Sequence, residues 1–280
     1  MASRQENRIN SKKTIKQLID KYQSDLPRDE LEQVLTLVLH KKIEYIYKNP
    51  DKLLPRTSIL SFQKLVKKRL TGWSLASLRG FKEFYGIDFL VNRCTLVPRP
   101  ESELLVEVAL KNIKKDFKIL DIGTGSGCLI LSVAKNFPSA KYTAVDISSS
   151  ALKIARTNAR KLKLKNTKFI QSNLLAKVPE NKFDIIIANL PYLTPKQMSE
   201  PSIQKEPKSA LVSGKDGLKH YQELLGQLPK YLNKKYLILL EIDPNQKDPI
   251  EKLIKNTLPA SKVSFLKDLA GNIRVAKINS

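Results

Sequence analysis

The sequence predicts an α/β protein in which a small helical bundle and a linking β-hairpin precede a doubly wound parallel sheet. Three changes of pattern along the 280 residues support this prediction. Residues 12–80 have helical periodicity, residues 81–97 are aromatic and β-branched, and strand-like and helix-like segments alternate from Phe117 onward. We therefore expect a helical domain at 1–80, a hairpin linker at 81–100 and an α/β domain at 101–280.

Apolar spacing predicts the helices of the first domain. Pro27 favours a helix start, because proline fits the first turn and the acids that follow suit the positive end of the helix dipole. Asn49–Pro50 predicts a stop, and a further helix is expected from Ser58 to about Leu70. The apolar residues that recur with the helical period are Leu31, Val34, Leu35, Val38 and Leu39.

The α/β domain is predicted from alternating segments. Continuous apolar strands such as 184–188 and 237–241 are typical of a parallel sheet covered on both faces. The expected strands are 117–123, 142–148, 167–173, 183–192 and 236–242. The expected helices lie within 98–113, 127–137, 150–162 and 221–232.

The composition excludes several classes of protein. Two cysteines cannot form a disulfide framework or a cysteine-rich zinc site, and no apolar run approaches the roughly 18 residues of a membrane span. The first residues lack the apolar stretch of a secretory signal. We expect a soluble, cytoplasmic protein that does not bind membranes.

The charge is strongly positive. With 50 Lys and Arg against 27 Asp and Glu, the formal net charge is +23, which favours weak attraction to RNA or the ribosome. Because the excess is spread along the chain, a lysine-rich solvated surface explains it equally well.

The strongest local motif follows the first expected strand and opens a helix, where ligands of open α/β sheets bind. It reads Asp-Ile-Gly-Thr-Gly-Ser-Gly-Cys over residues 121–128. Its G-x-G-x-G spacing differs from that of dinucleotide-binding loops, and it lacks the Lys-Ser/Thr pair of a nucleotide P-loop. The residues expected to hold the ligand are Asp121, Gly123, Thr124, Gly125, Ser126 and Gly127.

Two further strand ends complete the expected ligand site. Asp146 ends the next strand, where a carboxylate accepts hydrogen bonds from ribose hydroxyls. A ligand with a ribose, an amino-acid end and no pyrophosphate is S-adenosylmethionine, so we expect this methyl donor, its product S-adenosylhomocysteine and no metal. Asn173 and Leu174 follow the third strand, where they would meet the adenine. The structural alternatives are a Gly-rich turn beside a surface aspartate and a plain loop asparagine.

The fourth strand ends in Asn189-Leu190-Pro191-Tyr192. This uncharged segment, residues 189–192, is called the acceptor loop below. It suits methylation of an amide or ring amino nitrogen, whose lone pair is delocalised. The Asn189 side chain and the Leu190 backbone carbonyl, fixed by Pro191, would accept the two N–H groups, and Tyr192 offers a flat apolar face. Catalysis would then rest on alignment and oriented dipoles. A strand-to-loop exit with turn chemistry is the alternative, and His40 and His220 are expected to lie outside the site.

Together these residues resemble the class I methyltransferases of planar nitrogens. The resemblance is most specific to the protein-(glutamine-N5) methyltransferases of peptide-chain release factors, the PrmC/HemK family, and it extends over about residues 30–278. Further segments that resemble this family are Arg69–Gly72, Gly80–Gly86, Leu96–Glu103, Glu206–Pro207, Ala210–Leu211, Gly214–Leu218, Glu241–Ile242 with Gln246, and Lys267–Gly271.

The resemblance implies a Rossmann-like methyltransferase domain and a substrate-recognition role for residues 1–80. We also expect a monomer, although the sequence does not determine the oligomeric state. The implied substrate is the glutamine of the Gly-Gly-Gln motif in class I release factors. By residue match, Gly123–Gly127, Asp146, and Asn173 or Leu174 fall on donor-binding positions, and Asn189–Tyr192 falls on the glutamine-binding loop.

The chain departs from the family at two positions of this match. Leu190 stands where a first proline is usual, and we expect only its backbone carbonyl to matter. Asn173 stands where an acid is usual, so its adenine contact is open, as are the roles of Arg99 and Glu101.

Three other functions remain open at this point. An rRNA adenine-N6 methyltransferase has the same form of acceptor loop, but that family places its donor loop near the N-terminus, whereas here the donor strand begins near residue 117. A glutamine methyltransferase of a ribosomal protein is barely separable by sequence. A non-catalytic RNA-binding protein of methyltransferase fold would have no need to keep both loops.

Overall fold

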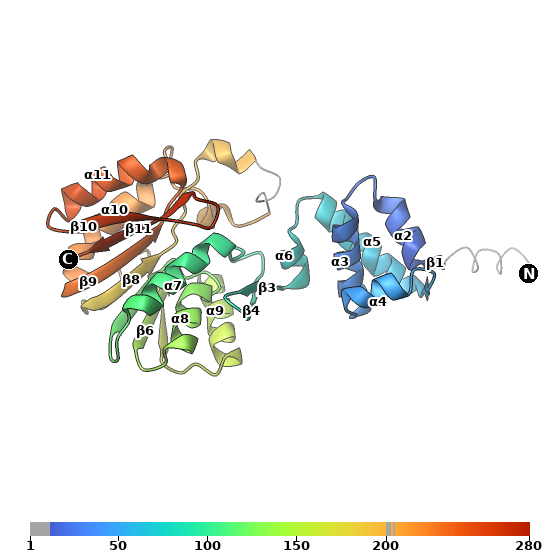
Figure 1. The fold of residues 1–280 in the computed structure, drawn as a ribbon, viewed down its shortest axis with the longest axis horizontal. Helices are drawn as coiled ribbons and strands as arrows, with labels where there is room; N and C mark the ends of the chain where they lie inside the picture. The colour runs from blue at the N-terminus through green and yellow to red at the C-terminus, as the bar shows by residue number, and fades with distance from the viewer. Residues whose placement is uncertain (1–11, 200–202, 204) are drawn as a thin grey trace, which may run out of the picture. The chain divides into compact units, whose positions relative to one another are not determined.

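The computed structural model describes residues 12–199, 203 and 205–280, and the chain divides into two compact units between Arg79 and Gly80 (Figure 1). The helical unit comprises residues 1–79 and 201–205. The sheet unit comprises residues 80–200 and 206–280.

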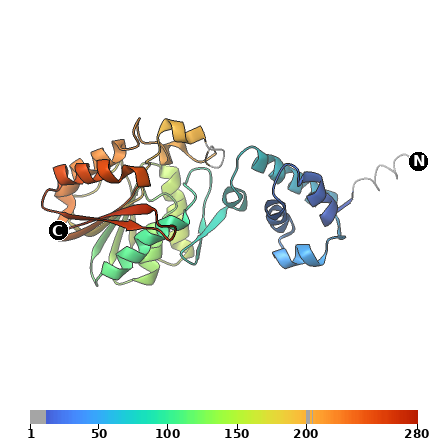
Figure 2. The same cartoon turned by 45° about the horizontal axis from the view of Figure 1, so that its top comes forward.

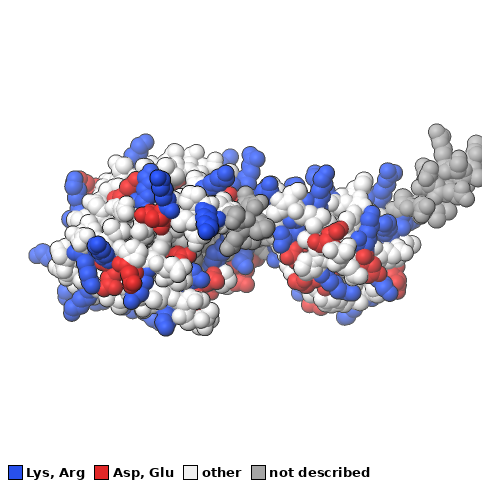
Figure 3. Space-filling view, turned by 90° about the horizontal axis from the view of Figure 1, so that it is seen from above, with Lys and Arg blue, Asp and Glu red and all other residues white. Residues whose placement is uncertain are grey.

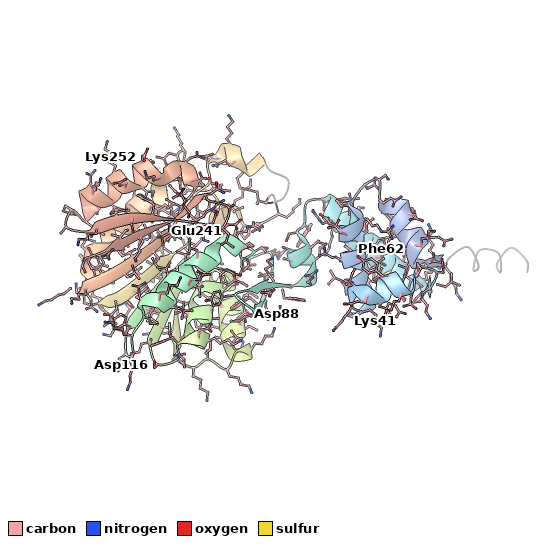
Figure 4. All side chains as sticks on the ribbon, in the orientation of Figure 1. Lys41, Phe62, Asp88, Asp116, Glu241 and Lys252 are labelled. Carbon is pink, nitrogen blue, oxygen red and sulfur yellow. The ribbon has the colours of Figure 1, made fainter. Side chains whose placement is uncertain are left out.

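The helical unit packs five helices around a small apolar core that contains Phe62 (Figure 4). As expected, α3 begins directly after Pro27, but the helical stretch expected to continue past it breaks at His40, whose φ of 53° is left-handed. The elements are β1 (Lys13–Thr14), α2 (Ile15–Tyr22), α3 (Arg28–Leu39), α4 (Ile43–Lys48), β2 (Leu53–Leu54), α5 (Arg56–Leu70) and α6 (Leu75–Arg79). The short antiparallel pair β1–β2 has no counterpart among the expected elements.

The sheet unit is built on seven strands in the order β10-β11-β9-β8-β5-β6-β7. The strands are β5 (Lys118–Ile122), β6 (Lys141–Asp146), β7 (Thr167–Gln171), β8 (Phe183–Ala188), β9 (Leu232–Glu241), β10 (Lys262–Lys267) and β11 (Ile273–Asn279). The strands β5 to β9 run parallel to one another, as expected. The sequence interpretation missed the antiparallel β10–β11 pair, which a short turn joins into a hairpin on the edge of the sheet.

Helices cover both faces of the sheet (Figures 1 and 2). The helices α7 (Glu103–Asn112), α8 (Cys128–Asn136) and α9 (Ser149–Lys161) share one apolar core with alternate strand residues such as Ile185 and Ile187. The helices α10 (Lys219–Gln227) and α11 (Lys247–Thr257) share the other core, with Ile186 and Ala188. Because neighbouring strand residues point to opposite faces, both faces of the central strands are apolar.

The expected hairpin is present and packs on the sheet unit. Its strands are β3 (Phe81–Phe84) and β4 (Ile87–Leu90), and Phe84 and Phe89 are buried in the core formed with α7 and α8. Tyr85 and Gly86 both have positive φ, which gives the two-residue turn that matches strand twist. The buried Asn158 of α9 bonds both the N–H and the carbonyl of Leu90 and also the Ser126 carbonyl. The hairpin is thereby tied to the loop after β5.

Two surface properties can be read from the described residues. None of their helices is both long enough and apolar enough to cross a membrane. On the face shown in Figure 3, basic and acidic side chains are interspersed, so the positive excess forms no single basic surface on that face.

Candidate active site

The loop after β5 is fixed by backbone hydrogen bonds to β6. The N–H groups of Gly123 and Thr124 both donate to the Val145 carbonyl, at 2.9 Å each. Gly123 has a φ of +75°, and a Cβ on it would lie 3.0 Å from Leu190 Cδ2. A larger residue at 123 would therefore press on the loop that follows β8.

Asp146 joins the end of β6 to this loop. Its Oδ2 accepts the Gly125 N–H and its Oδ1 accepts the Ser148 N–H, both at 2.8 Å. Each carboxylate oxygen keeps a second lone pair, so Asp146 can still accept from a ligand hydroxyl. Burial raises the pKa of Asp146, and the backbone donors oppose that rise.

Asp121 lies beneath the loop and is fully buried. Thr124 Oγ1 donates to its Oδ2 at 2.6 Å, whereas its Oδ1 has no protein partner among the described residues. Burial raises the pKa of Asp121 to about 7. An unpartnered buried carboxylate oxygen fits a cationic ligand, because such a group is costly unless it is paired.

A single pocket brings most of the expected residues together. Those lining it are Gly123, Gly125, Asp146, Asn173, Leu174, Asn189, Leu190 and Pro191. Those outside its lining are Asp121, Thr124, Ser126, Gly127 and Tyr192. Residues expected to bind the donor and residues expected to bind the acceptor therefore line one cavity.

The strand register explains this convergence. β8 lies between β5 and β9, with Ile122 opposite Ala188 and Ala188 opposite Leu240. The loops that follow these strands therefore start side by side at the same edge of the sheet, where ligands of such sheets bind.

Sequence reasoning missed several residues that line the pocket. Ile147 is 59% exposed there and offers an apolar surface directly after Asp146. Other lining residues were given no role in the sequence analysis, although Leu96, Pro207 and Ala210 lie in segments that resemble the family: Cys94, Thr95, Leu96, Pro207, Ser209 and Ala210. The sequence signal that could have indicated Ile147 is its position directly after the acid that ends the strand.

Buried Glu206 joins the two segments of this outer wall. Its carboxylate accepts the Val97 N–H at 3.0 Å and the Arg99 guanidinium at 2.5 Å. Arg99 thus has a structural role at the pocket wall.

His220 was expected to lie outside the site, and that expectation is wrong. It lines the pocket, and its Nδ1 lies 2.6 Å from the Oγ of fully buried Ser213. The same oxygen accepts the His220 backbone N–H at 2.9 Å. The Ser213 hydroxyl can donate to Nδ1 or accept from it, according to which ring nitrogen of His220 carries the proton. Burial lowers the pKa of His220 and favours the neutral form of the ring.

The acceptor loop is held from several sides. Asn189 Nδ2 donates to Ser102 Oγ at 3.2 Å, and the Tyr192 carbonyl accepts from Gln246 Nε2 at 3.0 Å. Leu190 was expected to act only through its carbonyl, but its side chain is buried in the core, with 3% of the residue's surface exposed. It therefore also anchors the loop.

Tyr192, the last residue of the acceptor loop, lies beside buried Glu241. The Tyr192 hydroxyl lies 3.5 Å from Glu241 Oε1, and Glu241 Oε2 has no protein partner among the described residues. Burial raises the pKa of Tyr192, and neighbouring Glu241 raises it further. Burial also raises the pKa of Glu241 to about 7.

The described residues contain no group of three or more His, Cys, Asp or Glu side chains placed to hold a metal ion.

Comparison with known proteins gives consistent matches. A family model described as a methyltransferase domain matches residues 113–273. The chain is 35% identical over 263 residues to a release factor glutamine methyltransferase of Rhodopirellula baltica, covering 90% of this chain and 89% of the relative. It is 34% identical over 254 residues to the protein of that name from Coxiella burnetii, covering 90% and 91%.

A solved ribosomal protein L11 methylase from Lactobacillus delbrueckii matches the fold with a TM-score of 0.50 at 23% identity, covering 67% of this chain and 82% of that one.

Proposed function

The chain belongs to the release factor glutamine methyltransferases, and from this premise we propose how its pocket and the Asn189–Tyr192 loop perform the family's reaction. The enzyme transfers a methyl group from S-adenosylmethionine to the side-chain amide nitrogen of a release factor glutamine. The expected class I methyltransferase fold is confirmed by the family model and by the mainly parallel sheet covered by helices.

The residues of the pocket fit the methyl donor. When bound, S-adenosylmethionine supplies an electrophilic methyl group on a positively charged sulfur. Asp146 would accept hydrogen bonds from the ribose, and the unpartnered oxygen of Asp121 would compensate the positive charge of the amino-acid end. Ile147 and Leu174 would cover the apolar faces of the base. Asn173, which is exposed at the pocket, remains a proposed adenine contact.

The acceptor loop would align the glutamine amide. Asn189 directs its NH₂ group toward Ser102, so its Oδ1 is free to accept one N–H of the substrate. The Leu190 carbonyl would accept the other, and Pro191, which lines the pocket, would pack against the planar amide. Drawing both protons outward leaves the nitrogen facing the methyl group, and alignment of this kind contributes much of the rate in a site without a strong base.

One observation carries the proposed role of these residues: donor-side and acceptor-side residues line the same pocket, because β8 lies directly beside β5. A methyl-transfer assay with labelled donor tests it on a class I release factor, on its Gln→Ala variant at the Gly-Gly-Gln motif, on rRNA and on ribosomal proteins. We expect label in the unmodified release factor alone. Label in rRNA or in a ribosomal protein would redirect the assignment, and label in the Gln→Ala variant would refute the target residue.

We also propose that the helical unit contributes to recognition of the protein substrate. Six large apolar side chains are exposed among the described residues, and four of them lie in this unit: Tyr47, Leu53, Leu60 and Leu70. Exposed apolar surface of this kind favours protein contacts. Replacing Leu53 and Leu60 by Ser should raise KM for the release factor and leave KM for the donor unchanged.

We expect the enzyme to act as a monomer in the cytoplasm, with a weak, salt-sensitive attraction to RNA from its net charge of +23.

A further inference from the structure

An asparagine at the acceptor position works in only one of its two amide orientations. The carbonyl oxygen accepts the N–H of the substrate amide, whereas the NH₂ group would meet that N–H donor to donor. The two orientations have almost the same shape, so packing alone does not select between them. Hydrogen-bond partners behind Asn189 must make the choice.

The structure places one such partner, Ser102, and a buried carboxylate, Glu241, behind Asn189. Its Nδ2 donates to Ser102 Oγ at 3.2 Å, and its side chain also faces the carboxylate of Glu241. Ala188 is opposite Leu240 in the β8–β9 ladder, so Asn189 and Glu241 are the next residues along these two strands. Ser102 and Glu241 are 3% and 2% exposed, so water does not compete for these contacts.

The ionised form of Glu241 selects the working orientation. A carboxylate only accepts hydrogen bonds, so ionised Glu241 favours orientations in which the Ser102 hydroxyl and the Asn189 NH₂ group point their donors toward it. With its proton directed to Glu241, Ser102 Oγ is left to accept from Asn189 Nδ2. Both interactions point the Asn189 NH₂ group away from the substrate and its oxygen toward it.

Protonation of Glu241 removes this selection. A carboxylic acid offers an O–H donor, which Ser102 Oγ can accept, and the Ser102 proton is then free to point at Asn189. The amide is now equally well satisfied with its oxygen toward Ser102, which presents NH₂ to the substrate.

The surroundings of Glu241 place this protonation near neutral pH. Burial raises the pKa of Glu241 to about 7, with Glu101 raising it further and Ser102, Arg274 and Asn189 lowering it. The other groups facing it are the Tyr192 hydroxyl from the acceptor loop, Tyr221 of α10, whose hydroxyl donates to the Glu241 carbonyl, and the Cys128 thiol of α8. Figure 4 marks Glu241 in the sheet unit.

We propose that Glu241 is a positioning residue of the methyl-transfer reaction, which in its ionised form holds the Asn189 amide with the oxygen toward the acceptor glutamine. The inference rests on the proposed function, since it concerns the same loop. It assigns to Glu241 control of the amide orientation and not contact with substrate.

Kinetics of the full-length enzyme test the proposal through Glu241→Gln, which keeps the side-chain shape. In the wild type, kcat for the release factor should rise as pH increases through about 7 and then level off. In Glu241→Gln, kcat should fall by about 10- to 100-fold at pH 8 and lose this pH dependence, because the new amide always offers a donor to Ser102. Donor affinity, measured by calorimetry, should change by less than about twofold. A variant with wild-type kcat and an unchanged pH profile overturns the proposal.

Two further variants separate positioning from folding. Ser102→Ala should lower kcat less and keep the pH dependence, because Glu241 still faces Asn189. Glu251→Gln, in an ion pair with Lys255 on α11, is the matched control and should leave kcat and its pH profile unchanged. An equal effect of the two glutamine variants would contradict the assignment.

An NMR titration separates this proposal from the proposed function. The side-chain NH₂ signals of Asn189, identified by their loss in Asn189→Asp, should shift with a midpoint near pH 7 in the wild type and stay constant in Glu241→Gln. An enzyme that leaves the release factor unlabelled but shows this shift would refute the function and keep the orientation control. A labelled release factor without this NMR shift would keep the proposed function and refute the orientation control.

Discussion

Gly217 offers a test of the acceptor loop at a residue that never meets the substrate. It has a φ of +78°, and a Cβ on it would overlap the Tyr192 carbonyl oxygen and lie 2.5 Å from Gln246 Nε2. The Tyr192 carbonyl and Gln246 Nε2 are themselves hydrogen-bonded at 3.0 Å. Gly217→Ala therefore drives a methyl group into the contact that holds the acceptor loop.

The size of the effect follows from these distances. Ordinary contacts of a Cβ lie at 3.4–4 Å, so Tyr192 and Gln246 must retreat by about 1 Å. A misplacement of about 1 Å in a site that works by alignment costs roughly 100-fold in rate. The left-handed backbone adds roughly 1–2 kcal/mol of strain to the folded state. We expect kcat to fall roughly 100-fold and donor affinity to stay close to that of the wild type, since Gly217 does not line the donor pocket.

Two glycines provide matched controls for this variant. Gly271 has nearly the same φ, +84°, but a Cβ there meets nothing within 4 Å, so Gly271→Ala isolates backbone strain. Gly226 lies within α10 with open space and no positive φ, so Gly226→Ala should be neutral or stabilise by up to about 1 kcal/mol. The assay combines kcat for release factor methylation with calorimetry for the donor and thermal unfolding. If Gly217→Ala lost no more activity than Gly271→Ala, the packing argument would be refuted.

The remaining predictions concern single side chains of the pocket. Asn189→Ala should lower kcat by roughly 100-fold or more with donor affinity within about twofold, and an equal loss of affinity by calorimetry would contradict its role. Asp146→Ala should weaken donor binding by roughly 1–3 kcal/mol, and unchanged calorimetric affinity would exclude it from the donor site. His220→Ala should raise the donor Kd measured by calorimetry and leave kcat at saturating donor nearly unchanged, so a loss confined to kcat would argue against a donor-side role. Leu190→Pro should keep activity but lower the free energy of unfolding by roughly 1.5–3 kcal/mol in denaturant titration, and a dead yet stable enzyme would show that Leu190 does more than anchor the loop.

Local patterns predicted the central fold well. The strands that carry the site are continuous apolar runs, and their order was implied by alternation with helices, so the loops at Gly123 and Asn189 were correctly expected at strand ends. The β10–β11 hairpin was missed because neither strand is a continuous apolar run. β10, at the edge of the sheet, is only partly buried and has Lys262 and Lys267 at its ends, and β11 interrupts its buried Val275, Ala276 and Ile278 with Lys277.

The walls of the pocket could not be predicted in the same way. Glu206 sits in a loop far along the chain from Val97 and Arg99, and nothing in its neighbourhood indicates that it is buried. His220 was misjudged because its position inside α10 is fixed by buried Ser213, a contact that depends on where the loop before α10 folds back. These contacts exist only once the sheet has brought distant segments together.

The acceptor loop explains why residues that touch neither donor nor acceptor matter at this site. In the proposed mechanism its functional atoms are an amide oxygen and a backbone carbonyl, neither of which can enforce its own direction. We propose that direction comes from Ser102 and Glu241 beside Asn189, and from Gly217 and Gln246 beside Tyr192. These four residues lie in segments that the sequence analysis matched to the family without assigning them a role. Their common physical role is to hold two oxygen atoms still, and this requirement makes the rate sensitive to substitutions that touch neither donor nor acceptor.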